Sequence, residues 1–304
     1  MADVRHEATV VQLEGPGGAL QARRRKRLTS LASNTLIYGF LLAFAFLTLF
    51  PFFWMLITSF KLPGDVFRLP PNFRPSLLWT DTPFENYTQV LFQFDFLRYA
   101  GNSLFVATTA ATGQLVTCSL AGFAFARMRF PLKNVLFALL IFTLLIPIEV
   151  TIIPEFLLMV RLGWLDTYLP LIVPSLMVGA FGTFLLTEYF KTVPASLEEA
   201  ATIDGASPFA IYRHIFLPLA TPALASLFVI AFITNWNELL RPVLYISDRN
   251  LRTLPLGLTT LQGQYESSWT LLMAGSIISI LPMIMVYLAA QKYIIRGFMS
   301  SGIK

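Results

Sequence analysis

Charged side chains are scarce in this sequence. Of its 304 residues, only 13% are Asp, Glu, Lys or Arg, whereas 56% are hydrophobic. Soluble globular domains carry a charged residue at about a quarter of their positions. The shortage excludes an ordinary soluble domain and predicts an all-α polytopic membrane protein, because helices satisfy their own backbone hydrogen bonds in lipid.

The residues that most often perform enzyme chemistry are also few. Cys118 is the only cysteine, so no intramolecular disulfide can form. His6 and His214 are the only histidines, which excludes a histidine-rich metal site or cluster of general bases. The phosphate loop G-x-x-x-x-G-K-[ST] is absent, so the chain cannot hold ATP by that motif. We therefore expect no catalytic residue, no metal and no directly bound cofactor, and any energy from ATP must come through another subunit.

Long apolar runs alternate with shorter polar stretches along the chain. A helix needs roughly 20 apolar residues to cross a bilayer. Six runs of about this length predict six transmembrane helices. In order, they cover about residues 36–60, 102–125, 134–157, 168–190, 218–240 and 270–294.

Basic residues near the ends of these runs predict the orientation. Residues 23–27 are all Arg or Lys and precede the first run. Lys and Arg accumulate on the cytoplasmic side of membrane proteins, where they also contact anionic lipid. This interpretation is preferred to a nucleic-acid site, so membrane lipid is an expected partner and nucleic acid is not. With six spans, both termini are predicted to be cytoplasmic.

The polar segment 188–218 separates the fourth and fifth predicted spans and carries its own helix signals. Ser196, followed three residues later by Glu199, fits a capping box and predicts a helix beginning at Leu197. Gly205 predicts the turn that closes this helix, because glycine takes the left-handed conformation without a Cβ clash.

A second short helix is predicted after the turn, because Ser207 is a favoured N-cap residue and Pro208 is tolerated in a first turn. Helices below roughly a dozen residues are marginal alone and need neighbours. The side chains expected to face the rest of the protein are Leu197, Ala200, Ala201, Phe209 and Tyr212. Those expected to face water or a partner are Glu198, Glu199 and Asp204. On local physics alone, a solvated connector in which Glu199 only caps its helix is an equally good interpretation.

The segment resembles the EAA loop of permease subunits of binding-protein-dependent, ATP-driven importers. That loop has the pattern E-A-A, three residues, G, nine residues, I-x-L-P. The sequence matches it at Glu199, Ala200, Ala201, Gly205, Ile215, Leu217 and Pro218. The resemblance implies a type I ABC importer permease fold, in which this loop, with Glu198 and Asp204, docks into a groove on a cytoplasmic ATPase and couples it to the spans.

Polar side chains within the predicted spans are candidates for the translocation pathway. Gln114 is one, although its neighbour Gly113 belongs to a face of small residues for which helix packing is the preferred interpretation. The end of the fifth span resembles the W-N-E/D element of carbohydrate-type permeases, whose neighbourhood borders the pathway. The candidates there are Asn235, Asn237 and Glu238. For Trp236 alone, a place in an interfacial aromatic belt is the preferred interpretation.

The resemblance to maltose-type permeases covers nearly all of the chain and implies its partners and place. These are a homologous permease that completes a heterodimer, two cytoplasmic ATPase subunits and an extracytoplasmic sugar-binding protein, in a prokaryotic inner membrane. The implied function is half of a pathway for a sugar, such as a di- or oligosaccharide. Import of glycerol phosphate or a polyol would leave a similar chain. An ion-driven secondary carrier is a rival class, against which the near absence of ionisable groups in the middle of the spans argues.

The predicted organisation has four parts. Residues 1–33 are a disordered basic tail, and residues 34–97 are the first span with an external loop. The permease core is expected at 98–294, with the coupling loop at 188–218. Residues 295–304 form a cytoplasmic tail.

Overall fold

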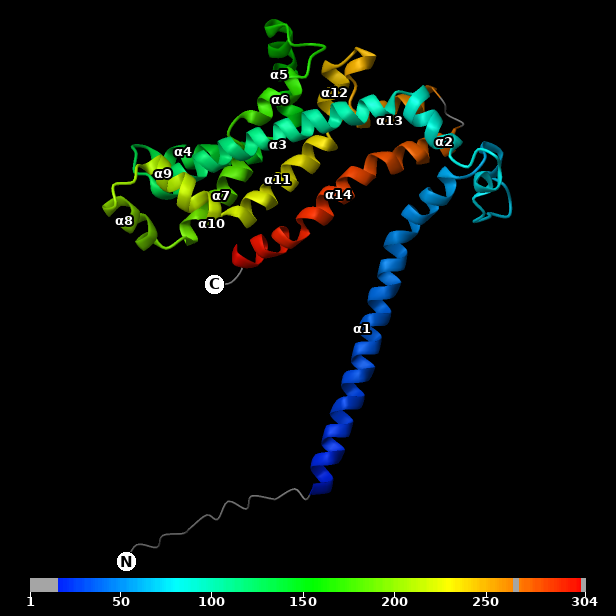
Figure 1. The fold of residues 1–304 in the computed structure, drawn as a ribbon, viewed down its shortest axis with the longest axis horizontal. Coiled ribbons are helices and arrows are strands. Elements are labelled where there is room, and N and C mark those ends of the chain that lie inside the picture. The colour runs from blue at the N-terminus through cyan, green and yellow to red at the C-terminus, as the bar shows by residue number, and fades with distance from the viewer. Residues whose placement is uncertain (1–15, 265–267, 302–304) are drawn as a thin grey trace, which may run out of the picture. The chain divides into compact units, whose positions relative to one another are not determined.

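All regular structure in the described residues is helical. The structure, a computed structural model, describes residues 16–264 and 268–301 (Figure 1). Its α-helices are α1 (Pro16–Ser59), α2 (Glu85–Thr88), α3 (Phe96–Arg127), α4 (Lys133–Phe142), α5 (Ile148–Leu162), α6 (Leu169–Leu176), α7 (Ala180–Thr192), α8 (Ala195–Ile203), α9 (Pro208–Ile211), α10 (Leu217–Leu219), α11 (Thr221–Trp236), α12 (Leu240–Tyr245), α13 (Leu254–Gln264) and α14 (Trp269–Ser301). Single 3-10 or π-helical turns join several of them. The predicted all-α class is confirmed.

The chain divides into two compact units, residues 1–55 and residues 56–304. Most of α1 lies in the first unit. Its apolar part, Ser33–Ser59, is 27 residues long, and its most apolar 18-residue window has no buried residue. A helix of this length that is apolar on every side suits a hydrocarbon surrounding. The prediction of a first span at about 36–60 agrees with these bounds.

Four helical segments of the described chain are long and apolar enough to cross a membrane. They are Ser33–Ser59, Phe96–Arg127, Leu169–Thr192 and Trp269–Lys292. Two bent pairs of helices raise the number to six if each pair is counted as one span. The prediction of six transmembrane helices agrees with this count.

The third predicted span is broken in two. The segments Lys133–Leu145 and Ile148–Leu162 are bent by 100° relative to each other, so the prediction of one helix over 134–157 was wrong. Pro147 explains the break, because it has no N–H to donate and disfavours helical backbone in the residue before it. Ile146 is accordingly extended, with φ −90° and ψ 110°.

The fourth predicted span is interrupted between α6 and α7, and the fifth follows a sharp bend. Between α6 and α7, Met177 and Gly179 have extended backbones. The fifth span, α11, begins at Thr221. The segment Pro208–Leu219 before it makes an angle of 79° with α11. The start at Thr221 agrees with the predicted start of the fifth span at about residue 218.

Helix α3 is central to the larger unit. It packs against α6, α7 and α11, and α11 packs in turn against α14 (Figure 1). Small residues allow these close approaches: a Cβ atom at Gly122 would lie 2.9 Å from the Cβ of Leu186. One at Gly113 would lie 1.9 Å from the Cδ2 of Leu176. The predicted packing role of the face that contains Gly113 is confirmed.

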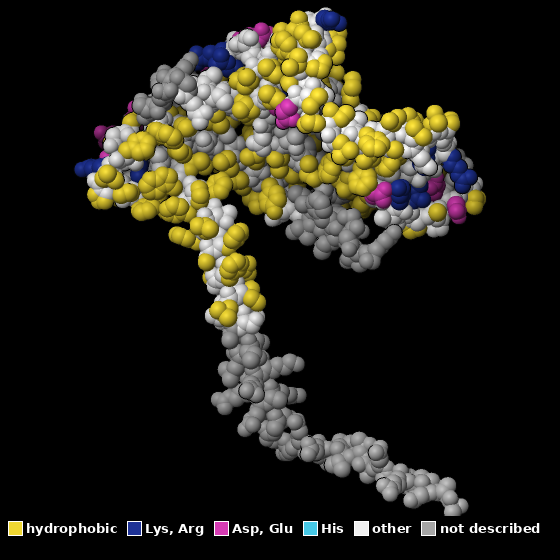
Figure 2. Space-filling view, turned by 180° about the vertical axis from the view of Figure 1, so that it is seen from behind, with side chains coloured by type: hydrophobic (Ala, Val, Ile, Leu, Met, Phe, Trp, Pro, Cys, Tyr) yellow, Lys and Arg dark blue, Asp and Glu magenta, His cyan; other side chains and the backbone are white. Residues whose placement is uncertain are grey.

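Hydrophobic side chains cover much of the outer surface of the larger unit. Figure 2 shows them over most of the visible face, with charged side chains mainly near its edges. Leu145 is 76% exposed and Ile153 is 69% exposed. Contiguous apolar patches of this extent are rare on soluble monomers and mark a membrane or partner surface.

Candidate functional site

The segment 188–218 forms the predicted helix, glycine turn and second helix. Helix α8 ends in a Schellman motif: the N–H of Ala206 donates to the carbonyl of Ala201 at 2.9 Å, and that of Gly205 to Thr202 at 3.1 Å. Gly205 has φ +82°, a left-handed conformation that side chains with a Cβ rarely adopt. The predicted role of Gly205 as the end of the helix is confirmed.

The two predicted helix starts have different outcomes. Helix α8 begins at Ala195 after Pro194, so the prediction of a capping box at Ser196 and Glu199 with a start at Leu197 was wrong. Pro194 sets this start, because its fixed φ suits the entry to a helix. The second start is confirmed, since the Oγ of Ser207 accepts a hydrogen bond from the N–H of Ala210 at 3.3 Å.

Ile211 of α9 is buried, but several other apolar side chains of the two short helices face outward. Ile203 is 86% exposed, Phe209 is 62% exposed and Leu197 is 43% exposed, and Ala200 is exposed as well. Of the side chains predicted to face the protein, only Tyr212 is buried and Ala201 half-buried. The predicted inward direction of Leu197, Ala200 and Phe209 was therefore wrong.

Glu198 is held at the inner side of α8 by a residue that the sequence analysis did not select. Its Oε2 lies 3.7 Å from the Nη1 of Arg127, the last residue of α3. The Nη2 of Arg127 donates to the carbonyl of Phe190 at 2.7 Å and also to that of Val193. The guanidinium carbon lies 5.0 Å from the centroid of the Phe216 ring. Glu198 was expected to face water or a partner, whereas Glu199 and Asp204 are exposed as expected.

An aromatic cluster lies beneath the two short helices. The ring centroid of Phe123 on α3 lies 5.1 Å from that of Phe216 and 5.4 Å from that of Tyr212. Phe190 on α7 completes the cluster, with its centroid 5.6 Å from that of Phe216. The hydroxyl of Tyr212 and that of Ser119 are 2.6 Å apart and buried. The loop is thus fixed to α3 and α7 by rings, and such pairs are worth about 0.5–1.5 kcal/mol each beyond their buried area.

The last residues of the EAA pattern join the loop to the fifth span. Ile215 and Leu217 are half-buried against the aromatic cluster, and Pro218 is exposed. Ile215 lies in a π-helical turn, Tyr212–Phe216. The hydroxyl of Tyr189 on α7 donates to the carbonyl of Leu219 in α10 at 3.1 Å, which ties α7 to the start of the fifth span.

Only two of the four predicted pathway residues lie at the same place. Asn235 accepts a hydrogen bond from the hydroxyl of Ser175 at 3.1 Å, beside the α6–α7 break. Gln114 lies at the same break, since a Cβ on Gly179 would be 2.7 Å from its Nε2. Their assignment to the pathway stays a prediction.

Asn237 and Glu238 make their own local contacts instead. The Nδ2 of Asn237 donates to the carbonyl of Ile233 at 2.9 Å, and the Oε1 of Glu238 accepts from the N–H of Leu240 at 2.9 Å. Trp236 is only 2% exposed and donates to the carbonyl of Ser279 at 3.1 Å. Its predicted place in an interfacial aromatic belt was therefore wrong.

A family model described as "binding-protein-dependent transport system inner membrane component" matches residues 118–299. The chain belongs to this family. A putative ABC transporter permease protein, ORF2 of Caldicellulosiruptor sp. strain Rt8B.4, is 36% identical over 260 residues, which cover 84% of this chain and 91% of that protein. The sn-glycerol-3-phosphate transport system permease protein UgpE of Brucella abortus strain 2308 is 32% identical over 278 residues, 88% of this chain and 97% of that protein.

Solved structures agree with the family. A chain of a bacterial ABC transporter involved in the import of the acidic polysaccharide alginate is 26% identical and superposes with a TM-score of 0.75, covering 89% of this chain and 98% of that chain. A second chain, from a bacterial alginate ABC transporter in complex with an alginate pentasaccharide-bound periplasmic protein, is 14% identical with a TM-score of 0.61, over 86% and 94%, and shows the fold alone. The protein is an inner-membrane permease subunit of an ABC importer, with the type I permease fold.

The permease contains a charged cluster that the sequence analysis also missed. Arg241 on α12 contacts Glu155 on α5 through two hydrogen bonds, from Nε at 2.8 Å and from Nη2 at 3.2 Å. Its Nη1 lies 3.6 Å from the Oε2 of Glu238. Burial raises the pKa of the adjacent Tyr245 hydroxyl to about 12, with the charge of Glu155 adding to the effect, so Tyr245 stays protonated. Arg241 and Glu155 are 86 positions apart in the chain, and no local pattern pairs them.

Asp166 fixes the next turn of the permease. Its Oδ1 accepts from the N–H groups of Ser247 at 2.5 Å and Asp248 at 2.9 Å. The hydrogen bond from Asp248 and that from Ser247 lower the pKa of Asp166 below its usual value. The carboxylate therefore stays ionised and joins the turn after α5 to that after α12.

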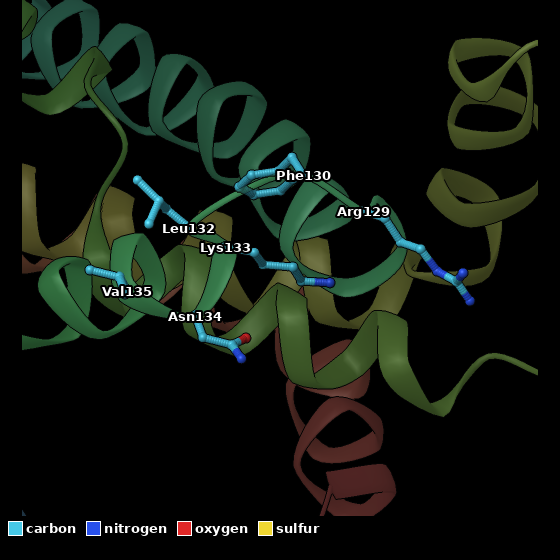
Figure 3. A pocket seen from close by; sticks show the side chains of 6 residues that line it. All are labelled: Arg129, Phe130, Leu132, Lys133, Asn134 and Val135. Carbon is cyan, nitrogen blue, oxygen red and sulfur yellow. The ribbon is translucent and has the colours of Figure 1, made fainter.

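A pocket of about 350 Å³ adjoins the turn between α3 and α4 (Figure 3). Arg129 and Lys133 are its cationic side chains. In Figure 3 Arg129 extends away from the other labelled residues, and the Nζ of Lys133 donates to the carbonyl of Met128 at 3.0 Å. The two cationic side chains of the pocket therefore do not converge on a common ligand position.

Proposed function

We propose that the outward face of α8 and α9 is the surface through which this permease binds a cytoplasmic ATPase. The observation that carries the proposal is the exposure of Leu197, Ile203 and Phe209 on a loop that is fixed to α3 and α7. Burying one such side chain in a groove contributes about 1.5–3 kcal/mol. Glu199 and Asp204 beside them can meet cationic side chains at the rim of that groove.

The permease itself is proposed to be non-catalytic and to bind no cofactor. ATP binding and hydrolysis belong to two partner ATPase subunits, and a homologous permease completes the pathway as a heterodimer. The family description, which names binding-protein dependence, supports a third kind of partner, an extracytoplasmic solute-binding protein. The solved alginate transporter, which is complexed with a periplasmic protein, supports it as well.

The mechanism follows from the attachment of the loop. ATP closes the pair of ATPase subunits, the closing subunits carry the loops of both permeases with them, and the bundles rotate between inward and outward access. This requires the loop to be cytoplasmic. With six spans both termini then lie on the same side as the loop, as the basic run at 23–27 also indicates.

The substrate is proposed to be a hydroxyl-rich solute, either a di- or oligosaccharide or a glycerol phosphate or polyol. The alginate transporter supports the first class, and the UgpE relatives support the second. Asn235, Asn237, Glu238 and Gln114 are the proposed pathway residues of this subunit. An ion-driven carrier is the rival class, and it predicts transport without any ATPase.

The experiment that tests the proposal is purification of the membrane complex in mild detergent with all candidate subunits co-expressed. We expect the ATPase to co-purify with the permease and hydrolysis to increase when the loaded binding protein is added. Transport by the purified permease alone, driven by an ion gradient, would contradict the proposal. Native mass spectrometry of the binding protein would identify its retained ligand and separate the two substrate classes.

A further inference from the structure

Arg127 connects three parts of the permease through one guanidinium group. It leaves the end of α3 and contacts two carbonyls at the end of α7, the carboxylate of Glu198 on α8 and the ring of Phe216. Its side chain is only 13% exposed, whereas that of Glu198 is 29% exposed. These contacts lie between the loop 188–218 and α3 and α7, the two helices to which the loop is fixed.

The chemistry of this position favours arginine over lysine. The last carbonyls of a helix lack partners within the helix, and they attract a cation because the helix dipole is negative there. A planar guanidinium can donate to two carbonyls, face a carboxylate and stack on a ring at the same time. A lysine ammonium is a single point charge and cannot reproduce this set of contacts.

Helix α8 has few other attachments to the spans. Within residues 16–264 and 268–301, the Glu198–Arg127 contact is the only ion pair or side-chain hydrogen bond that leaves α8. The hydroxyl of Thr202 donates within the helix, to the carbonyl of Glu198 at 2.7 Å. Ala201 adds a half-buried apolar contact on the same side. This ion pair is therefore the one polar side-chain attachment of α8 to the spans among the described residues.

We propose that Arg127 is a positioning residue that fixes the direction of α8 relative to α3 and α7. A displacement of α8 then moves both spans, instead of being lost as rotation of α8 alone. This inference rests on the proposed docking of an ATPase to α8. The ion pair is partly exposed, and such pairs contribute little to stability. Breaking it should therefore change the alignment of α8 while the fold remains intact.

The test combines a distance measurement with an activity measurement. Spin labels on cysteines at exposed positions Leu104 of α3 and Ser196 of α8 report the direction of α8, since native Cys118 is buried and does not react. In the Glu198→Gln variant we expect a broader distance distribution. In the reconstituted complex we expect stimulation of ATP hydrolysis by the loaded binding protein to fall about fivefold or more. The Arg127→Lys variant should likewise broaden the distance distribution and reduce the stimulation of ATP hydrolysis.

The matched control is Glu188→Gln. It removes an exposed ion pair, Lys191–Glu188 at 2.7 Å, near the end of α7 without touching α8, so both measurements should remain as in the unmodified protein. If the distribution stays narrow in Glu198→Gln, Arg127 does not position α8, even if activity falls. If the distribution broadens and stimulation is unchanged, the direction of α8 is not what transmits motion. Failure of the ATPase to co-purify with the unmodified permease would instead refute the proposed function itself.

Discussion

Replacement of Gly205 tests whether the conformation of the turn in segment 188–218 is required for coupling. Gly205 has φ +82°, and a Cβ built there meets no atom within 4 Å. A larger residue therefore meets no steric clash with neighbours, and its cost is the left-handed backbone alone. That cost is about 1–2 kcal/mol for an L-residue with a Cβ, and it is smaller for asparagine, which tolerates this region. An energy of this size changes a conformational equilibrium about 5- to 30-fold.

We expect stimulated ATP hydrolysis in the reconstituted complex to decrease in the order Gly205, Gly205→Asn, Gly205→Ala and Gly205→Val. Gly163 provides the matched control, because it also has a positive φ, +67°, and no atom within 4 Å of an added Cβ. Gly163→Val carries the same backbone cost outside the loop and should leave coupling intact. Thermal unfolding of both valine variants should change by a similar amount. Equal loss of coupling in the two valine variants, or full coupling in Gly205→Val, would refute the reasoning.

Three further predictions concern other parts of the permease. Ile203→Glu should weaken binding of the ATPase by an order of magnitude or more in a co-purification titration, because about 1.5–3 kcal/mol of apolar burial is lost, whereas Leu69→Glu, at an 84% exposed position outside the loop, should not. Because hydrogen bonding lowers the pKa of Asp166, its contribution to stability is present above about pH 4 and is lost as the pH falls through the lowered value. The thermal midpoints of the unmodified permease and Asp166→Asn should therefore differ at neutral pH and converge in acid, and a constant difference would show that the charge is irrelevant. Arg241→Ala should lower the free energy of unfolding by about 1–3 kcal/mol because it leaves carboxylates without a partner, and adding Glu155→Ala should restore part of the loss in denaturant titrations.

Features that depend on local backbone chemistry could be predicted from the sequence. Gly205 and Ser207 act through neighbours within five residues, so their roles as a helix end and a helix start followed from residue type. The capping box at Ser196 failed for a local reason as well, because Pro194 offers an earlier start. The break at Pro147 was not predicted, because proline can either bend a span gently or divide it.

Features that depend on tertiary contacts could not be predicted. The outward direction of Ile203 and Phe209 is set by the surface to which the loop is fixed, which the sequence does not show. Arg127 resembled an ordinary basic residue at the end of a span, and only the structure brings it to Glu198, 71 positions away. The direction of an apolar side chain is hard to predict in a membrane protein, because exposing it to lipid lacks the free-energy cost of exposing it to water.

The most direct test of the central claim is a photo-cross-linking amino acid placed at Ile203 in the complete complex. Its side chain is 86% exposed, so it can react with whatever covers the outward face of α8. The proposed function predicts a cross-link to the ATPase subunit whose yield changes between the nucleotide-free and ATP-bound states. A cross-link only to lipid or to the permease itself, with the ATPase present and hydrolysing ATP, would contradict it.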